Sequence, residues 1–152
     1  MKPVVSLIGL GLTLACISSA SAQQGPRIKE MKPGKYAYSI EMQNPGMPMK
    51  MPPMTFTQCV TPKDMDEGRA FQAQKDAGVD CTYSNMNSSA GRFQFSASCK
   101  MQGDMSMEAD YDGTVAGDVV TLNVKQKMQG GQIPDNMRHS TMKMVMTRQG
   151  DC

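Results

Sequence analysis

Apolar and polar side chains alternate with a period of two along most of the chain, and this pattern limits the fold more than any other feature. Such alternation is typical of β-strands that bury one face and leave the other in water. It covers residues 36–42, 54–60, 93–99, 120–124 and 142–146, and further strands are expected from Cys81 onward and over 105–115. The sequence therefore predicts about seven strands.

Turn residues separate these strands and leave room for one helix. Lys32-Pro33-Gly34 is a turn signal that we expect to start the domain. Thr61-Pro62 has the form of a helix N-cap followed by proline at the first helical position. A helix is predicted from there to about Ala77, where Gly78 would end it.

No regular alternation of helices and strands is present, so a parallel sheet is not expected. The polar residues at every second position instead indicate antiparallel strands with one wet face. We predict a mainly β fold, an antiparallel meander or partly open barrel of about seven strands, with one short helix inserted between the second and third strands. The prolines within residues 45–53 predict a loop or an exposed edge there, because proline cannot donate a ladder hydrogen bond.

Residues 1–22 have the three parts of a secretory signal: Lys2, an apolar stretch, and a small-residue cleavage site that ends at Ala22. The apolar stretch is too short for a transmembrane helix, which needs about 20 residues, and no later segment comes close. We expect cleavage after Ala22 to leave a single β-rich domain, residues 23–152, in the periplasm or outside the cell. Lipoprotein signals usually carry Leu three residues before the acylated cysteine. Thr13 stands there, so we expect Cys16 to leave with the leader.

Four cysteines would remain after this cleavage: Cys59, Cys81, Cys99 and Cys152. An even number of cysteines in an exported chain indicates disulfides, and none of the four has the C-x-x-C spacing of redox or zinc sites. Four cysteines allow three pairings. We favour Cys59–Cys81, which would clamp the base of the helix, together with Cys99–Cys152, which would tie the last residue to a strand in mid-chain.

Charge and motifs exclude several classes of function. The net charge is +2, from 16 Lys+Arg against 14 Asp+Glu. This balance gives no excess of basic residues of the kind that binds nucleic acid. The sequence holds one histidine, His139, and no nucleotide-binding or zinc-protease motif, so we do not expect an enzyme. Residues 108–113 imitate the start of an EF-hand loop, but Val119 stands where the loop needs Glu. We interpret Asp112-Gly113 as a turn.

Methionine is unusually frequent, with 17 residues, of which all but Met1 follow the leader. Soft thioether sulfur suits Cu(I), and the best candidate ligands are Met47, Met49, Met51 and Met54, which are not expected in the core. The alternatives are that methionine fills an irregular core, or that it lines a surface. Our leading hypothesis is a non-catalytic protein without a cofactor, whose Met-lined surface binds an apolar small molecule or an envelope protein. A periplasmic Cu(I)-binding protein is the alternative.

Several short motifs follow one another in a recognisable order. They are Lys32-Pro33-Gly34 before an aromatic strand, the Met/Pro tract over 45–54, the run Thr-Gln-Cys-Val-Thr-Pro over 57–62, Cys81 after an acidic residue, Cys99 at a strand end, and the terminal Gly150-Asp151-Cys152. In this order they resemble domain-of-unknown-function family 3617 over essentially the whole mature chain, with Tyr36 where we would expect Trp. The resemblance implies a small exported protein of Gram-negative bacteria with a β-rich fold and two disulfides. It implies no activity.

Overall fold

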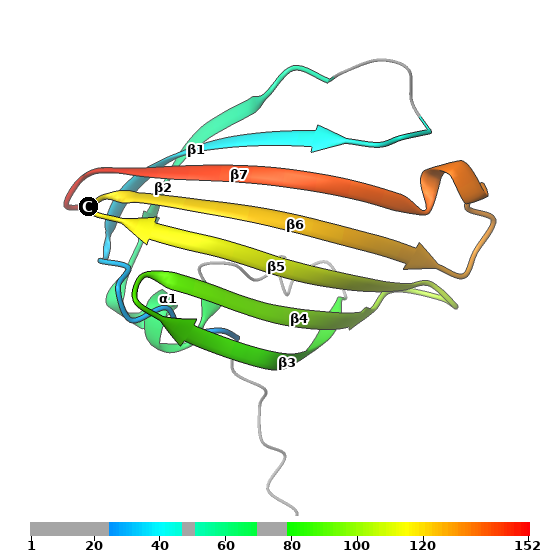
Figure 1. Cartoon of the computed structure of the whole chain (residues 1–152), viewed down its shortest axis with the longest axis horizontal. Helices are drawn as coiled ribbons and strands as arrows, with labels where there is room; N and C mark the ends of the chain where they lie inside the picture. Colours follow the sequence, from blue (N-terminus) through cyan, green and yellow to red (C-terminus); the bar gives the residue numbers. More distant parts are fainter. Residues whose placement is uncertain (1–24, 47–50, 70–78) are drawn as a thin grey trace, which may run out of the picture.

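A computed structural model describes residues 25–46, 51–69 and 79–152. Within these residues, seven strands form one sheet in the order β2-β1-β7-β6-β5-β4-β3, and all neighbours run antiparallel. The strands are β1 (Gly34–Gln43), β2 (Met54–Val60), β3 (Asp80–Ser89), β4 (Arg92–Lys100), β5 (Ser106–Ala116), β6 (Val119–Gln129) and β7 (His139–Gly150), and a 3-10 turn η3 (Asp135–Met137) precedes β7. The sheet is one curved layer with β2 and β3 at its edges, and it does not close (Figure 1). The predicted open antiparallel fold is confirmed.

The helix predicted between the second and third strands is present, but it is short. α1 spans Pro62–Asp66, and Thr61 caps it as predicted. The backbone N–H of Asp64 donates to the Thr61 hydroxyl at 3.2 Å, and the backbone N–H of Thr61 donates to the Asp64 carboxylate at 3.0 Å. The Thr61 hydroxyl and the Asp64 carboxylate thus each accept a hydrogen bond from a backbone N–H that would otherwise be unpaired at the start of the helix.

The predicted extension of this helix to Ala77 is wrong. Gly68 has φ +65°, a left-handed conformation that ends a right-handed helix, and a side chain here would collide with the Gly25 carbonyl. The rest of the predicted helix, residues 70–77, lies outside the described residues. In the part of the chain that is described, no helix has the length and apolar character to cross a bilayer.

One face of the sheet, here called the inner face, carries the core. In β4 the side chains of Phe93, Phe95, Ala97 and Cys99 are buried at alternate positions, as predicted. The register then continues this face across the sheet, since Tyr38 of β1 lies beside Met146 of β7. The central buried side chains form one cluster: Tyr36, Tyr38, Phe93, Phe95, Ala109, Val120, Leu122, Val124 and Met146.

The segment before β1 completes this core. Ile28 and Met31 are only 7% and 4% exposed, although their neighbours in the sequence are polar. The core therefore begins ahead of the Lys32-Pro33-Gly34 turn that we expected to start the domain. The Tyr36 hydroxyl fixes the turn by donating to the Lys32 carbonyl at 2.6 Å. Figure 1 shows α1 at the same end of the sheet as the C-terminus.

Candidate functional site

Apolar side chains of the inner face remain exposed where the sheet ends at β2. Met54 and Phe56 belong to this face because the register places them beside Ile40 and Tyr38 of β1. Met54 is nevertheless 55% exposed and Phe56 45% exposed. An edge strand has a neighbour on one side only, so its side chains lose less surface to packing than those of a central strand.

The exposed surface continues from β2 through β1 into β7. Ile40 lies beside Met144, and Met42 lies beside Met142. All four side chains are half-buried, so each still presents apolar surface. We define the apolar rim as the six side chains that these pairs connect: Met54 and Phe56 of β2, Ile40 and Met42 of β1, and Met142 and Met144 of β7.

The apolar rim offers apolar contact without charge. Methionine side chains are flexible and polarisable, so they adapt to ligands of irregular shape. The orientation of the Phe56 side chain is fixed because its ring stacks on the Tyr38 ring, with centroids 4.6 Å apart. Burial, together with the smaller effect of negative charge on Tyr36 and Asp64, raises the pKa of Tyr38 to about 12. The phenol beneath the rim therefore stays neutral at physiological pH.

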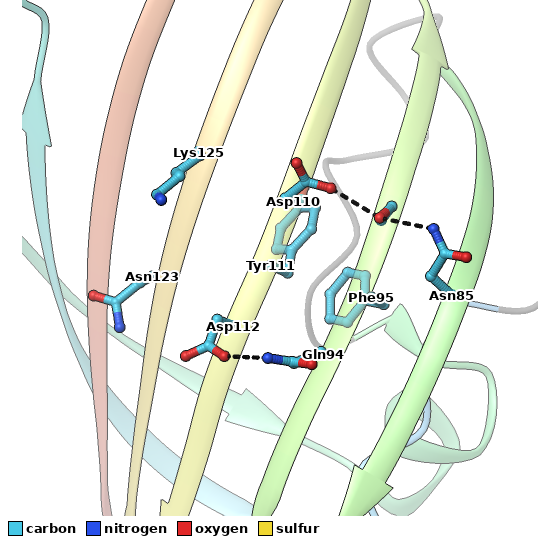
Figure 2. Close-up of a pocket in the computed structure, with 9 residues that line it drawn as sticks. Asn85, Gln94, Phe95, Asp110, Tyr111, Asp112, Asn123 and Lys125 are labelled. Atoms are coloured by element: carbon cyan, nitrogen blue, oxygen red, sulfur yellow. Dashed lines mark hydrogen bonds between the residues drawn. The ribbon is translucent and has the colours of Figure 1, made fainter.

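The opposite, outer face of the sheet carries a polar cavity of about 340 Å³ (Figure 2). The Ser96 hydroxyl donates to the Asp110 carboxylate at 2.8 Å and accepts a bond from the Asn85 amide at 3.3 Å. The Gln94 amide donates to the Asp112 carboxylate at 2.7 Å. Each carboxylate of β5 thus accepts a hydrogen bond from a neutral side chain on the neighbouring strand β4. Asn123 and Lys125 also line the cavity, as do Phe95 and Tyr111, although the Phe95 side chain belongs to the buried inner face.

The acidic residues of this cavity do not form a calcium loop. Residues 108–113 lie within β5, where Gly113 pairs with Phe93 on one side and Leu122 on the other. The interpretation of Asp112-Gly113 as a turn is wrong, because both residues lie inside β5. A Cβ at position 113 would collide with the Phe93 ring, so packing, not chain reversal, requires this glycine. Among the described residues, no group of three or more His, Cys, Asp or Glu side chains could hold a metal ion.

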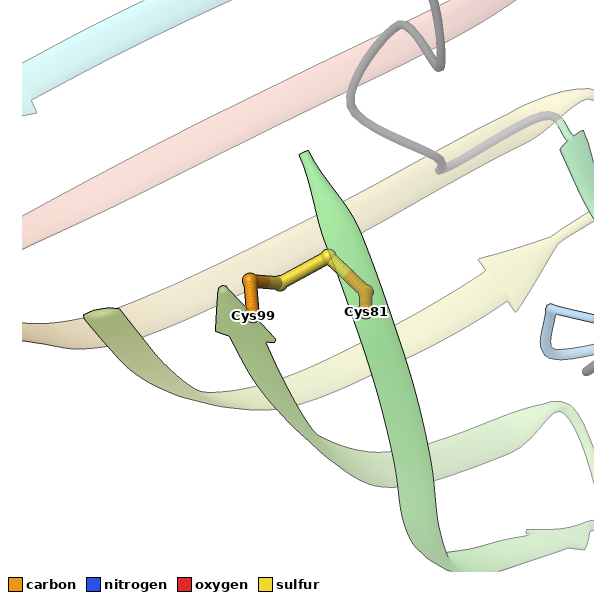
Figure 3. The surroundings of a disulfide bond; sticks show 2 residues. All are labelled: Cys81 and Cys99. Carbon is orange, nitrogen blue, oxygen red and sulfur yellow. A yellow bond between two sulfur atoms is a disulfide. The ribbon is translucent and has the colours of Figure 1, made fainter. Parts of the chain in front are cut away.

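The structure corrects the favoured disulfide pairing. Cys81 is bonded to Cys99, which lies directly opposite it in the register of β3 and β4 (Figure 3). Cys59–Cys81 is wrong because β2 and β3 are the two opposite edges of the sheet, and Cys99–Cys152 is wrong because β6 and β5 separate β7 from β4. Cys59 and Cys152 are exposed and carry no disulfide in this structure.

The structure describes only some of the remaining residues that the sequence suggested as functional. Met51 and Met54 are 47% and 55% exposed, whereas Met47 and Met49 lie outside the described residues, as do Cys16 and Ala22 of the leader. The Cu(I) site therefore stays a prediction. His139 is exposed at the start of β7, opposite Lys127.

Sequence reasoning assigned Phe56 and Ile40 to strands but not to a candidate site. The available signal was the position of Phe56 shortly after Pro52 and Pro53. Prolines favour an edge strand, and apolar residues on an edge strand remain partly exposed.

Fold and site together define a small, mainly β protein with an open antiparallel sheet and an exposed apolar edge. Residues 31–152 match the family DUF3617, described as proteins of unknown function, and the chain belongs to this family. The resemblance found in the short motifs is thus confirmed. No curated protein and no solved structure matches the chain.

Proposed function

We propose that this protein is an exported, non-catalytic binding protein that takes a small apolar ligand along the apolar rim. One observation carries the proposal: at Met54 and Phe56 the inner face stays apolar up to its exposed edge. Met54 and Phe56 are 55% and 45% exposed, yet they share a face with the buried core. Edge strands of soluble proteins often carry charged side chains that protect the exposed edge. Exposed apolar patches, by contrast, often mark binding sites.

The chemistry of the rim favours a flexible hydrocarbon chain as its ligand. Four of the six side chains are methionines, which can repack around a chain of variable shape. The Phe56 ring supplies the rigid contact, because Tyr38 fixes its orientation by stacking. Full burial of an apolar side chain contributes about 1.5–3 kcal/mol, so covering the exposed half of one contributes about 1 kcal/mol.

Export is supported by two features of the chain. Residues 1–22 have the organisation of a cleavable secretory signal. The Cys81–Cys99 bridge is typical of proteins that reside in an oxidising compartment such as the periplasm.

The non-catalytic role is supported by the state of the titratable groups near both faces. Tyr38 beneath the rim keeps its proton, since burial raises its pKa to about 12. On the outer face, Asp110 and Asp112 accept hydrogen bonds from neutral side chains across the strand. His139 is exposed at the start of β7. It lies far along the sequence from Asp110 and Asp112.

A binding experiment with a fluorescent fatty acid tests the proposal. The oxidised, processed protein is titrated with the probe, and the same titration is done with Phe56→Ser and Met54→Gln. We expect saturable binding by the wild type. Each variant should bind about tenfold more weakly, which corresponds to a loss of about 1.4 kcal/mol. Mass spectrometry of an organic extract of the purified protein should show a co-purified lipid.

Met86→Gln is the matched control, because Met86 is 59% exposed but lies on β3 at the opposite edge of the sheet. It should bind the probe as the wild type does. Equal weakening by Met86→Gln would mean that the probe follows exposed apolar surface in general. That outcome, or the absence of saturable binding by the wild type, would overturn the proposal.

A further inference from the structure

Two exposed cysteines approach each other at the end of the sheet where β1 begins. Cys59 lies in β2 opposite Lys35 of β1, and Lys35 faces Gly150 of β7 on its other side. Cys152 follows Gly150 by two residues. The C-terminal tail thus passes the first residues of β1 on its way toward β2.

Polar contacts and a glycine direct the tail along this path. The Nε of Arg148 donates to the Pro33 carbonyl at 2.8 Å, and the same guanidinium contacts the Asp151 carboxylate. Gly34 has φ +150°, and a Cβ at this position would collide with the Gly150 carbonyl and the Arg148 side chain. The tail can cross β1 closely because residue 34 has no side chain.

The sulfur atom of Cys152 lies against β2. The side chain of Cys59 hydrogen-bonds to the Cys152 thiol and raises its pKa, while a hydrogen bond with the Val60 backbone lowers it. Residues 59 and 60 are therefore the direct neighbours of the C-terminal thiol. Cys81 and Cys99, by contrast, are already bonded to each other on the far side of the sheet.

We propose that Cys59 and Cys152 form a second, reversible disulfide that fastens the C-terminus across the start of β1 onto the edge strand β2. The oxidant is a disulfide of a small thiol, such as oxidised glutathione. The Cys59 thiolate attacks one sulfur of this disulfide, whose S–S bond breaks, and the first donor thiol leaves. Cys152 then attacks the mixed disulfide and releases the second. The two protons of Cys59 and Cys152 end on the two donor thiols, and the pair of electrons reduces the donor.

Accessibility makes this bridge the more easily reduced of the two. Cys59 and Cys152 are both exposed, whereas Cys99 is 1% exposed. A small thiol therefore reaches the second bridge first. Closure also gives β2 a covalent link to the end of β7, although β1 is its hydrogen-bonded neighbour in the described sheet.

Peptide mapping of the full processed chain tests the pairing without any variant. The protein is oxidised with glutathione disulfide, alkylated while denatured, and cut with trypsin, which places the four cysteines in the different peptides 51–63, 76–92, 93–100 and 149–152. We expect 51–63 joined to 149–152, and 76–92 joined to 93–100. A bond between 51–63 and 76–92, or alkylation of both Cys59 and Cys152, would overturn the proposal.

A second measurement tests reversibility. The oxidised, folded protein is treated briefly with reduced glutathione and then alkylated. Label should enter peptides 51–63 and 149–152 before the other two. Hydrogen exchange of the β2 amides should become faster on this reduction, and it should already be fast in Cys152→Ser. Earlier labelling of Cys81 and Cys99, or unchanged exchange in β2, would contradict a reversible link that holds this strand.

Discussion

The ring of Phe56 lies parallel to the ring of Tyr38, with centroids 4.6 Å apart and an angle of 8° between the planes. Tyr38 is 5% exposed and belongs to the core, whereas Phe56 is 45% exposed. The pair therefore joins the buried part of the inner face to the apolar rim. Every ligand contact that we propose for Phe56 depends on this stacking to fix the ring.

Truncation of Phe56 should cost much less stability than truncation of a core ring. We expect Phe56→Ala to lower the free energy of unfolding by about 1 kcal/mol, since it removes one aromatic pair from a half-exposed position. Phe95→Ala should cost about 3–5 kcal/mol, because Phe95 is 3% exposed and stacks on Tyr111. Urea unfolding of both variants measures the difference. Similar losses would show that Phe56 is part of the core and not a free surface.

Removal of the Cys81–Cys99 bridge should destabilise the fold. The two residues are 18 positions apart, and closing a loop of this length contributes about 3 kcal/mol in the chain-entropy description. We expect Cys81→Ala with Cys99→Ala to lower the free energy of unfolding by that amount. Variant and reference protein both carry Cys59→Ser and Cys152→Ser, so that the Cys81–Cys99 bridge is the only disulfide that differs between them. An unfolding midpoint equal to that of the reference protein would contradict the expected contribution.

Gly113→Ala should be destabilising for a steric reason. A Cβ at this position would overlap the Phe93 ring on the neighbouring strand, and overpacking of this kind costs about 1–3 kcal/mol. Combining Gly113→Ala with Phe93→Leu should cost less than the sum of the two single changes, since the smaller side chain leaves room for the methyl group. Additive losses in thermal or urea unfolding would argue against the collision.

Stability should fall at alkaline pH. Burial raises the pKa of Tyr38 and of Tyr111 to about 12 from the ordinary value of 10.0. Above pH 10.0 the unfolded phenols lose protons that the folded ones still hold. The contribution of these residues is therefore complete below pH 10.0 and is lost as the pH rises toward about 12. Tyrosinate absorbance and urea midpoints across this range test the prediction, and titration of all four tyrosines near pH 10.0 in the folded state would refute it.

Competition for Cu(I) tests the alternative function. The exposed side chains of Met51 and Met54 are free to offer thioether sulfur, which suits this ion. If the cluster binds Cu(I), the wild type should withdraw it from a chromophoric chelator more strongly than a variant with Met47, Met49, Met51 and Met54 changed to Leu. Leucine keeps the apolar volume and removes the sulfur. Equal competition by both proteins would end the copper hypothesis.

Local residue patterns were enough for the strands and for the start of the helix. The alternation of Phe93, Phe95, Ala97 and Cys99 with polar residues placed them on one buried face. Thr61 and Pro62 located the first turn of α1, because capping depends on residues within one turn. The same local view failed at Asp112-Gly113, where a turn-like pair lies inside β5 because a ring from β4 needs the space.

The pairing of the cysteines depended on strand order, which residue spacing does not encode. Cys59 and Cys81 flank the helix in the sequence, yet the sheet order β2-β1-β7-β6-β5-β4-β3 places their strands at opposite edges. Cys81 and Cys99 face each other because β3 and β4 form a hairpin. The apolar rim also depends on strand order. Its residues on β1 and β7 are neighbours only because these two strands, which are far apart in the sequence, pair in the sheet.

The sequence by itself determined that this chain forms an antiparallel sheet with one apolar face, because a period of two fixes which side chains point the same way. Only the tertiary structure decided which of those apolar residues stay exposed and which cysteines meet. Exposure and disulfide geometry depend on the neighbouring strand in space, and that neighbour is chosen by the topology of the whole sheet.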